Sequence, residues 1–287
     1  MKLAENSIRN QTAEGNEPSP RPDVDPVLRR QMATKRRLIG RMNWRGAITV
    51  VCFFILWELL VRFRMPGFEG IPTLGEVWMA FTKNYLTNTT YWLSWAVSFE
   101  RVVYGFLISQ LLGIPIGLLL GTRQRFHEIV FPVVELLRPI PPIAWVPLSI
   151  LFWPTAELSI VFITFIGPFF IIIINVHDGV RSIKKEHWWL AMSLGAKPRD
   201  IFRRIILPSV IPSIAVGMTL GIAVTWNVVI AAEMIASDTG LGRLTWEGYV
   251  SHTVSTVIIG MISIGLAGYL STIVVDYAEK KMMPWKK

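Results

Sequence analysis

The chain has 287 residues, of which 52% are hydrophobic and 17% are charged, and its mean hydropathy is +0.45. This composition excludes an ordinary water-soluble domain and indicates a protein that crosses a membrane several times. The net charge of +9 would suit nucleic acid or an anionic membrane face. Because the basic residues lie at the edges of apolar runs, we expect a lipid bilayer and no nucleic acid as partner.

The N-terminal residues differ from the rest of the chain. Residues 1–40 contain Pro18, Pro20, Pro22 and Pro26 among polar residues, so we expect a disordered tail there and a membrane domain at residues 41–287. The tail is not a secretory signal, because the first apolar run begins only at Ala47. Cys52 is the one cysteine, which excludes a disulfide framework, and we expect no metal site.

Apolar stretches of the length that crosses a bilayer as a helix predict an all-α fold with six transmembrane helices. The third stretch contains Pro139, Pro141, Pro142 and Pro147, so we expect its helix to break or kink. The six stretches lie at about 47–63, 101–121, 128–152, 158–176, 209–233 and 254–277.

The positions of the basic residues predict the orientation of these spans. Lys and Arg gather before the first span, after the second, in the loop at residues 177–208 and at the C-terminus. The alternate loops at residues 64–100, 153–157 and 234–253 hold few. By the positive-inside rule, both termini and the loop 177–208 are cytoplasmic.

Four glycines in the second span recur at multiples of four residues and share one helix face: Gly105, Gly113, Gly117 and Gly121. Small residues on one face allow another helix to approach closely, so we expect helix packing there. A face that lines a transport pathway is the alternative.

The loop 177–208 contains the stretch "SLGAKPRDIFRRIILP", Ser193–Pro208. We expect a short helix at residues 182–194, a turn at Gly195, and a second helix from Pro198 to Pro208. An apolar stripe on the second helix comprises Ile201, Phe202, Ile205 and Ile206. Such a pair of helices either lies on anionic lipid or forms a knob that fits a groove on a soluble partner.

The spacing in this loop resembles that of the permease subunits of bacterial ABC importers. Their loop signature is E-A-A, three residues, Gly, nine residues, Ile, one residue, Leu-Pro, and Gly195, Ile205, Leu207 and Pro208 match its second part. At the E-A-A positions the chain has Trp189, Leu190 and Ala191, of which only the last agrees.

Further stretches resemble one branch of that family, the nitrate, sulfonate, taurine and bicarbonate type permeases. They are "RVVYGF" (Arg101–Phe106) with "LLGIPIGLLLG" after it, "RPIPPIAWVPLSILFW" (Arg138–Trp153) and "AAEMIASDTGLG" (Ala231–Gly242). After the stretch that ends at Trp153, this branch often has a Gly, whereas this chain has Pro154.

The resemblance implies a type I ABC importer permease in the bacterial inner membrane. Such a permease works by alternating access with two ATPase subunits, a second permease subunit, for which we expect a homodimer, and an extracytoplasmic solute-binding protein. It implies a small solute such as taurine or another sulfonate, nitrate or bicarbonate.

The chain lacks a G-x-x-x-x-G-K-[ST] loop, so we expect no enzyme activity and no cofactor of its own, with ATP and Mg²⁺ bound by the ATPase subunits. The residues implied in ATPase coupling are Lys184, Glu186, Trp189, Leu190, Ala191, Gly195, Ala196, Asp200, Arg203, Ile205, Leu207 and Pro208.

Polar groups inside spans are candidates for the translocation pathway, since their burial in lipid is costly. In the fifth span these are Thr225, Asn227 and Glu233, and Trp226 between them is a candidate for a bulky gate. Alternatively, they bond to a neighbouring helix, and Glu233 lies in interfacial water.

Two other classes of protein remain as alternatives. An ion-gradient-driven carrier or channel without an ATPase would require intramembrane acidic or His relays, or inverted repeats. A membrane enzyme would require clustered His and carboxylate residues, whereas His127, His177, His187 and His252 are scattered along the sequence.

Overall fold

The computed structural model describes residues 44–284, and this part of the chain is helical with no strand. The tail expected at residues 1–40 lies outside the described residues. The chain divides after Leu59 into two compact units, which are described separately. The helix α3 (Trp44–Arg62) begins in the first unit and contains residues 47–62 of the first predicted span. Glu58 interrupts its apolar stretch.

The second unit contains the long apolar helices. Among the described residues, four helical segments are long and apolar enough to cross a membrane, namely α5 (Thr89–Thr122), α8 (Ala156–Arg181), the path Pro198–Ala236 and α13 (Val254–Met282). The bent pair Gln124–Leu137 and Pro142–Phe152 makes a fifth if it counts as one span. The count of six spans therefore remains a prediction. Helix α5 is also longer than the span 101–121 that it contains.

The third predicted span is broken at its prolines. Helix α6 (Gln124–Leu137) is followed by the short 3₁₀ helix η1 (Pro142–Trp145) and by α7 (Val146–Phe152), with a bend of 90° between the two halves. Pro142 and Pro147 lie in the first turns of η1 and α7, where a missing N–H removes no helical hydrogen bond. The bend follows from this chemistry.

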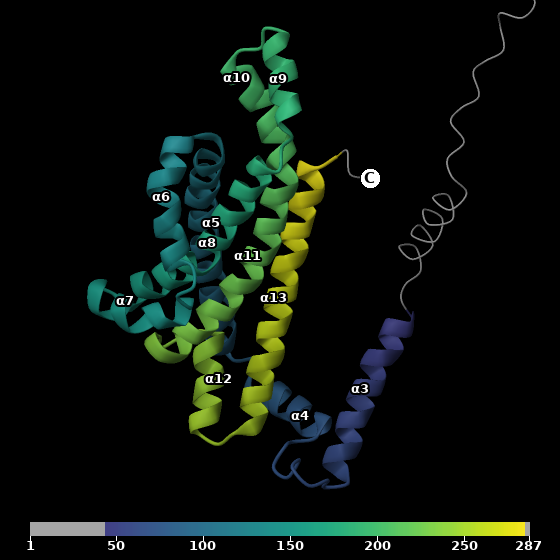
Figure 1. Ribbon diagram of the computed structural model, residues 1–287. Helices are drawn as coiled ribbons and strands as arrows, with labels where there is room; N and C mark the ends of the chain where they lie inside the picture. The colour runs from purple at the N-terminus through teal and green to yellow at the C-terminus, as the bar shows by residue number, and fades with distance from the viewer. Residues whose placement is uncertain (1–43, 285–287) are drawn as a thin grey trace, which may run out of the picture. The chain divides into compact units, whose positions relative to one another are not determined.

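Helix α8 is central to the second unit, because it packs on α5 and also on α11 (Leu207–Ala236) (Figure 1). The four glycines of α5 all face α8. A Cβ added to Gly117 would lie 2.7 Å from Cβ of Val176 and 2.8 Å from the carbonyl oxygen of Ile173. The glycine face thus lies in a helix contact that leaves no room for a side chain.

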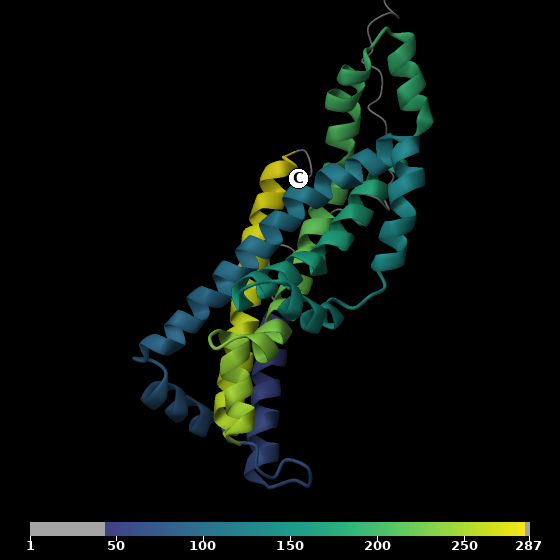
Figure 2. The ribbon, with the colours of Figure 1, turned by 90° about the vertical axis from the view of Figure 1, so that its left-hand side faces the viewer.

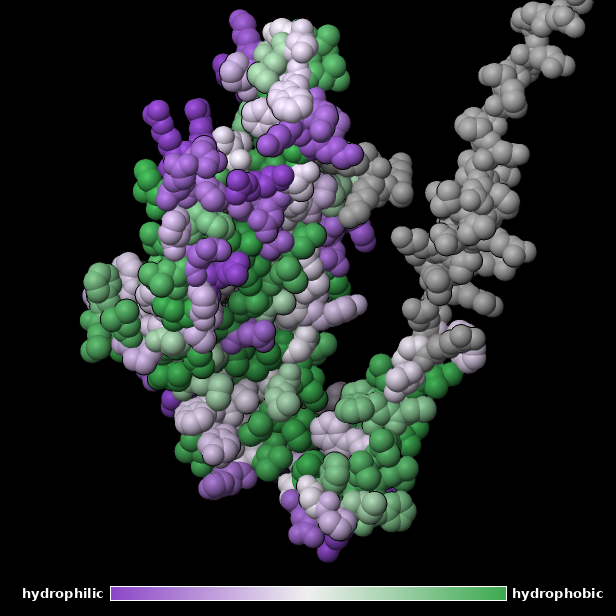
Figure 3. Space-filling view, viewed as in Figure 1, coloured by the Kyte–Doolittle hydropathy of each residue, from purple (hydrophilic) through white to green (hydrophobic). Residues whose placement is uncertain are grey.

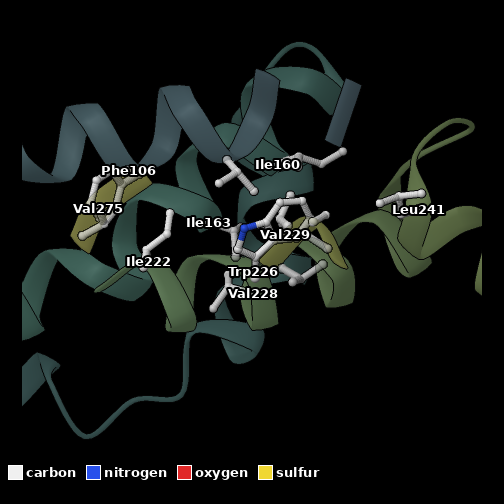
Figure 4. Close-up of a cluster of buried hydrophobic side chains, with 13 residues drawn as sticks. Phe106, Ile160, Ile163, Ile222, Trp226, Val228, Val229, Leu241 and Val275 are labelled. Atoms are coloured by element: carbon white, nitrogen blue, oxygen red, sulfur yellow. The ribbon is translucent and has the colours of Figure 1, made fainter. Parts of the chain in front are cut away.

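A buried apolar cluster joins α5, α8, α11 and α13 (Figure 4). Ile160 and Ile163 of α8 are fully buried in it, and Trp226 of α11 lies among them. A second cluster, at the other end of these helices, contains Val176 and Val210. The two clusters fix the packing of the bundle along most of its length.

The two ends of the bundle differ. At one end, α9 (Lys185–Ser193) and α10 (Pro198–Ile201) project beyond the other helices; we call this the knob end (Figures 1 and 2). At the other, the far end, lie α4 (Leu74–Asn84) and α12 (Leu241–Val250), which both pack on α13. On the face shown in Figure 3, hydrophilic residues gather toward the knob end and hydrophobic residues dominate the middle.

Candidate functional site

The knob consists of α9, α10 and the turn between them. Gly195 ends α9 with φ of +78°, and its N–H donates to the carbonyl of Met192 at 2.9 Å. The N–H of Ala196 donates to the carbonyl of Ala191 at 3.0 Å, which completes a Schellman motif. Pro198 then starts α10. The turn therefore has a defined geometry that depends on a left-handed residue at Gly195.

The knob is packed onto the ends of the two long helices beside it. Ala191, Ile201 and Ile206 are buried in a cluster with residues of α8 and α11. Ala196 and Ile205 are half-buried against the same cluster. Because this core is shared, the knob and the ends of α8 and α11 form one packed body.

The expected apolar stripe is only partly correct. Residues 202–206 form a π-helix, η2 (Phe202–Ile206), in which the N–H of Leu207 donates to the carbonyl of Phe202. A π-turn brings residues five apart into register, so Ile201 and Ile206 are both buried. Phe202 and Leu207, also five apart, both remain 36% exposed.

The expectation that the second helix ends at Pro208 is wrong. Helical structure runs from Pro198 to Ala236 without a break. A proline inside a helix normally meets the carbonyl four residues before it, and the wide η2 turn lies at that point. At the other end of the loop, α8 continues to Arg181. Little of the loop 177–208 is therefore irregular.

Most of the residues implied in coupling are exposed, either on the knob or on the helical segment that directly follows it. Trp189 and Leu190 are 58% and 62% exposed, and Leu194, which is outside the implied set, is 80% exposed. Such exposure is unusual for large apolar side chains that lie outside the candidate membrane spans. Asp200 is half-buried and Ala191 is buried. The other exposed residues of the set are Lys184, Glu186, Gly195, Arg203, Leu207 and Pro208.

The four pathway candidates have different environments. Thr225 is buried and donates to the carbonyl of Gly221 at 2.7 Å. Trp226 is buried and donates from Nε1 to Oγ of Ser271 at 3.0 Å. Asn227 is exposed on α11. Of these three side chains, the described structure leaves only Asn227 on the surface of the bundle.

Glu233, the fourth candidate, forms a buried ion pair with Arg101 of α5. Their exposed fractions are 0% and 2%, and Nη1 of Arg101 lies 2.9 Å from Oε1 of Glu233. Nη1 also donates to the carbonyl of Thr239 at 2.8 Å. Nε and Nη2 of Arg101 bind Glu157, at the start of α8. The alternative that Glu233 lies in interfacial water is therefore wrong.

The carboxylate of Glu233 accepts further hydrogen bonds that the sequence did not reveal. Ser98 donates from Oγ to Oε1 at 2.7 Å, and the N–H of Gly242 donates to Oε2 at 2.9 Å. A paired role for Arg101 could have been predicted from the sequence, because a charged residue at the edge of an apolar stretch requires a partner. No local pattern marked Ser98 or Glu157.

Two of the histidines are close in space, although they are scattered in sequence. The ring centroids of His127 on α6 and His177 on α8 lie 5.1 Å apart, and Phe131 stacks on both. Arg181 lies 3.2 Å from Nε2 of His127. Within the described residues, no group of three or more His, Cys, Asp or Glu side chains could hold a metal ion.

A family model described as "Binding-protein-dependent transport system inner membrane component" matches residues 113–284. The chain belongs to this family. This permease is 41% identical over 231 residues to a protein of Methanocaldococcus jannaschii whose name gives it as an ABC transporter permease, with 80% of the chain and 81% of that protein covered. It is 30% identical to the nitrate import permease protein NrtB of Leptolyngbya laminosa, with 86% of the chain and 91% of that protein covered. It is 27% identical to the bicarbonate transport system permease protein CmpB of Synechocystis, covering 82% and 87%.

Solved structures of ABC importers share the fold of this permease. An inward-facing form of the MetNI methionine ABC transporter matches with a TM-score of 0.54 and 18% identity. The match covers 74% of this permease and 99% of the matched transporter chain. A bacterial ABC transporter that imports alginate matches with a TM-score of 0.55 and 12% identity, covering 84% and 99%. The permease fold is therefore shared although the sequences have diverged.

Proposed function

We propose that this permease is the membrane subunit of an ATP-driven ABC importer that moves a small anion into the cytoplasm by alternating access. Relatives named as nitrate and bicarbonate permeases support the anion class, since both solutes are small oxyanions. In the proposed complex, two ATPase subunits bind ATP and Mg²⁺, a second copy of the chain completes the pathway, and a solute-binding protein delivers the anion. The knob end and both termini are cytoplasmic in the inner membrane, and the far end is extracytoplasmic.

The observation that carries this proposal is the rigid, exposed knob. An ATPase that closes on ATP can move the membrane helices only through a part that transmits force. The Schellman turn at Gly195 and the core shared with α8 and α11 give the knob that rigidity. Its exposed apolar side chains, Trp189, Leu190 and Leu194, would fill a groove on the ATPase subunit.

The alternative of a knob that lies on anionic lipid is less well supported. A helix on a membrane surface requires one continuous apolar face and a separate polar face. On α9, the charged Lys185 and Glu186 lie one turn before the exposed apolar Trp189 and Leu190, so charged and apolar side chains share the same sides of the helix. A shaped groove accommodates such a surface better than a flat bilayer.

The solute pathway is proposed to pass the exposed side of α11. Asn227 is exposed there, whereas Val216 and Leu220, eleven and seven residues before it on the same side, are exposed apolar residues. An amide within an apolar helix surface is costly in lipid but suits a pathway between two copies of the chain. Trp226 and Glu233 bond to other helices and Thr225 bonds within α11, which supports a structural role for these three residues.

Recovery of the complex from native membranes tests the proposal. Leu190→Asp places a charge in the proposed ATPase groove, and Val250→Asp places the same charge at the far end of the bundle, on an apolar side chain that is 60% exposed. We expect wild type and Val250→Asp to co-purify with a P-loop ATPase and Leu190→Asp to lose it. A wild-type chain that purifies without an ATPase, yet catalyses uptake in ATP-free vesicles, would overturn the proposal.

A further inference from the structure

Helix α12 has no side chain of its own to cap its N-terminus. Its N-cap residue is Gly240, with φ of +123°, so no N-cap side chain accepts a bond from the first turn. The first N–H groups of a helix require acceptors. Leu241 donates its N–H to Oγ of Ser98 on α5 at 2.9 Å, and Gly242 donates to the carboxylate of Glu233 on α11. Two other helices therefore cap α12.

Arg101 binds two groups beside the N-terminus of α12. From α5 it binds the carboxylate of Glu233 and the carbonyl of Thr239. Thr239 lies in the outer turn, residues 237–240, which joins α11 to α12. The turn has little room to move, because a Cβ on Gly240 would collide with the Glu233 carboxylate. A single guanidinium thus links α5 to both sides of the outer turn.

The outer turn and α12 form the walls of two cavities at the far end. One cavity, of about 840 Å³, lies between α12 and the segment from α4 to the start of α5, and it is lined by Tyr85 and Ser94 among others. The second, of about 330 Å³, lies beside the start of α8. Asp238 and Arg243 line both cavities. The position of α12 therefore decides the shape of both.

We propose that Arg101 is the positioning residue of the extracytoplasmic entrance, and that it holds α12 as a fixed wall of the larger cavity. This inference rests on the proposed function only for the assignment of the far end to the extracytoplasmic side. Arg101 acts through Glu233 and the outer turn and touches no solute. Glu157, which is 63% exposed at the start of α8, closes the other side of the guanidinium and fixes its direction.

The position of α12 is measured by the distance between spin labels in a Cys52→Ser background. Labels on Leu93 of α5 and Val250 of α12, which are 52% and 60% exposed, report on the wall. Labels on Leu111 and Tyr277, 73% and 70% exposed, report on α5 and α13 elsewhere. We expect Arg101→Met to broaden the first distance distribution and to leave the second unchanged. Arg123→Met, an exposed arginine at the other end of α5, is the matched control and leaves both unchanged.

Access to the cavity gives a second, independent measurement. Ser94 lines the larger cavity and is 6% exposed, so Ser94→Cys in the same background reacts slowly with a membrane-impermeant methanethiosulfonate. In right-side-out vesicles we expect Arg101→Met to raise this rate at least about tenfold, because the variant loses the bonds to Glu233 and Thr239 and about tenfold is the population change for one charge-assisted hydrogen bond. Reaction only from the cytoplasmic side would contradict the orientation in the proposed function. In that case the distances between the spin labels would still test the role of Arg101.

A buried Glu233 without its partner can prevent folding. The double variant Arg101→Met with Glu233→Gln removes both charges but keeps an oxygen that accepts from Gly242, and it still lacks the bond to Thr239. We expect the same broadened distance in this variant. An unchanged distribution between Leu93 and Val250 in a folded Arg101 variant would overturn the inference, as would an unchanged rate at Ser94→Cys.

Discussion

Arg101 on α5 and Glu233 on α11 form an ion pair with 2.9 Å between Nη1 and Oε1, and both side chains are buried. The two residues belong to the stretches "RVVYGF" and "AAEMIASDTGLG", which are far apart in the sequence. A buried charge is costly unless its hydrogen-bonding groups are satisfied. The bonds to Ser98, Gly242 and Thr239 supply that compensation. The pair therefore fixes the packing of α5 against the α11–α12 turn.

Removal of the buried partner should cost far more stability than removal of the exposed one. Glu233→Ala leaves Arg101 without its buried partner and leaves the N–H of Gly242 without an acceptor. We expect a loss of about 3–5 kcal/mol. Glu157→Gln changes a side chain that is 63% exposed, and we expect a loss of at most about 1 kcal/mol. Thermal unfolding of the two purified variants measures the difference, and equal shifts in Tm would contradict it.

The contact between α5 and α8 should not tolerate a methyl group at Gly117. A Cβ there meets the backbone oxygen of Ile173 at 2.8 Å, and backbone cannot rotate away. We expect Gly117→Ala to lower stability by about 1–3 kcal/mol. Gly265→Ala on α13, where no atom lies within 4 Å of the added Cβ, is the control and should be neutral or raise stability by up to about 1 kcal/mol. Denaturant unfolding of both variants provides the comparison, and similar losses for the two would exclude close packing as the cause.

The parts of the structure that follow from short-range rules were open to prediction from the sequence. The bend near Pro142 follows from the chemistry of a single residue type, and the turn at Gly195 follows from conformational freedom within one turn. The common face of the α5 glycines follows from helix periodicity. None of these features depends on a distant residue.

The features that the sequence did not predict depend on tertiary contacts. Arg101 and Glu233 are 132 residues apart, and a single sequence contains no signal that pairs them. The π-turn at residues 202–206 reflects the packing of Ile201 and Ile206 into one core as well as Pro208. The capping of α12 by Ser98 could not be read locally, because the donor and acceptor lie on different helices.

The turn in the knob should require a residue that tolerates a left-handed conformation. In Gly195→Val, the φ of +78° is strained for a β-branched residue, although the added Cβ has no neighbour within 4 Å. We expect the ATPase activity that solute stimulates in the reconstituted complex to fall severalfold, because the angle between α9 and α10 changes. Gly195→Asn, which tolerates this conformation, should retain most of the activity. Equal activity of the valine and asparagine variants would show that the angle of this turn does not matter.

The exposed amide of Asn227 should affect transport and not stability. Asn227→Leu replaces an exposed polar side chain on α11. Because substitutions of exposed residues usually change stability little, we expect a small change in Tm. If the solute passes this side of α11, uptake by the reconstituted complex falls while ATP hydrolysis without solute continues. Thr225→Val is the matched control. It replaces a buried hydroxyl that donates only to its own helix, so uptake should follow whatever modest change in stability it causes. Wild-type uptake by Asn227→Leu would place the pathway elsewhere, because a polar contact with the solute cannot be lost without a change in its transport.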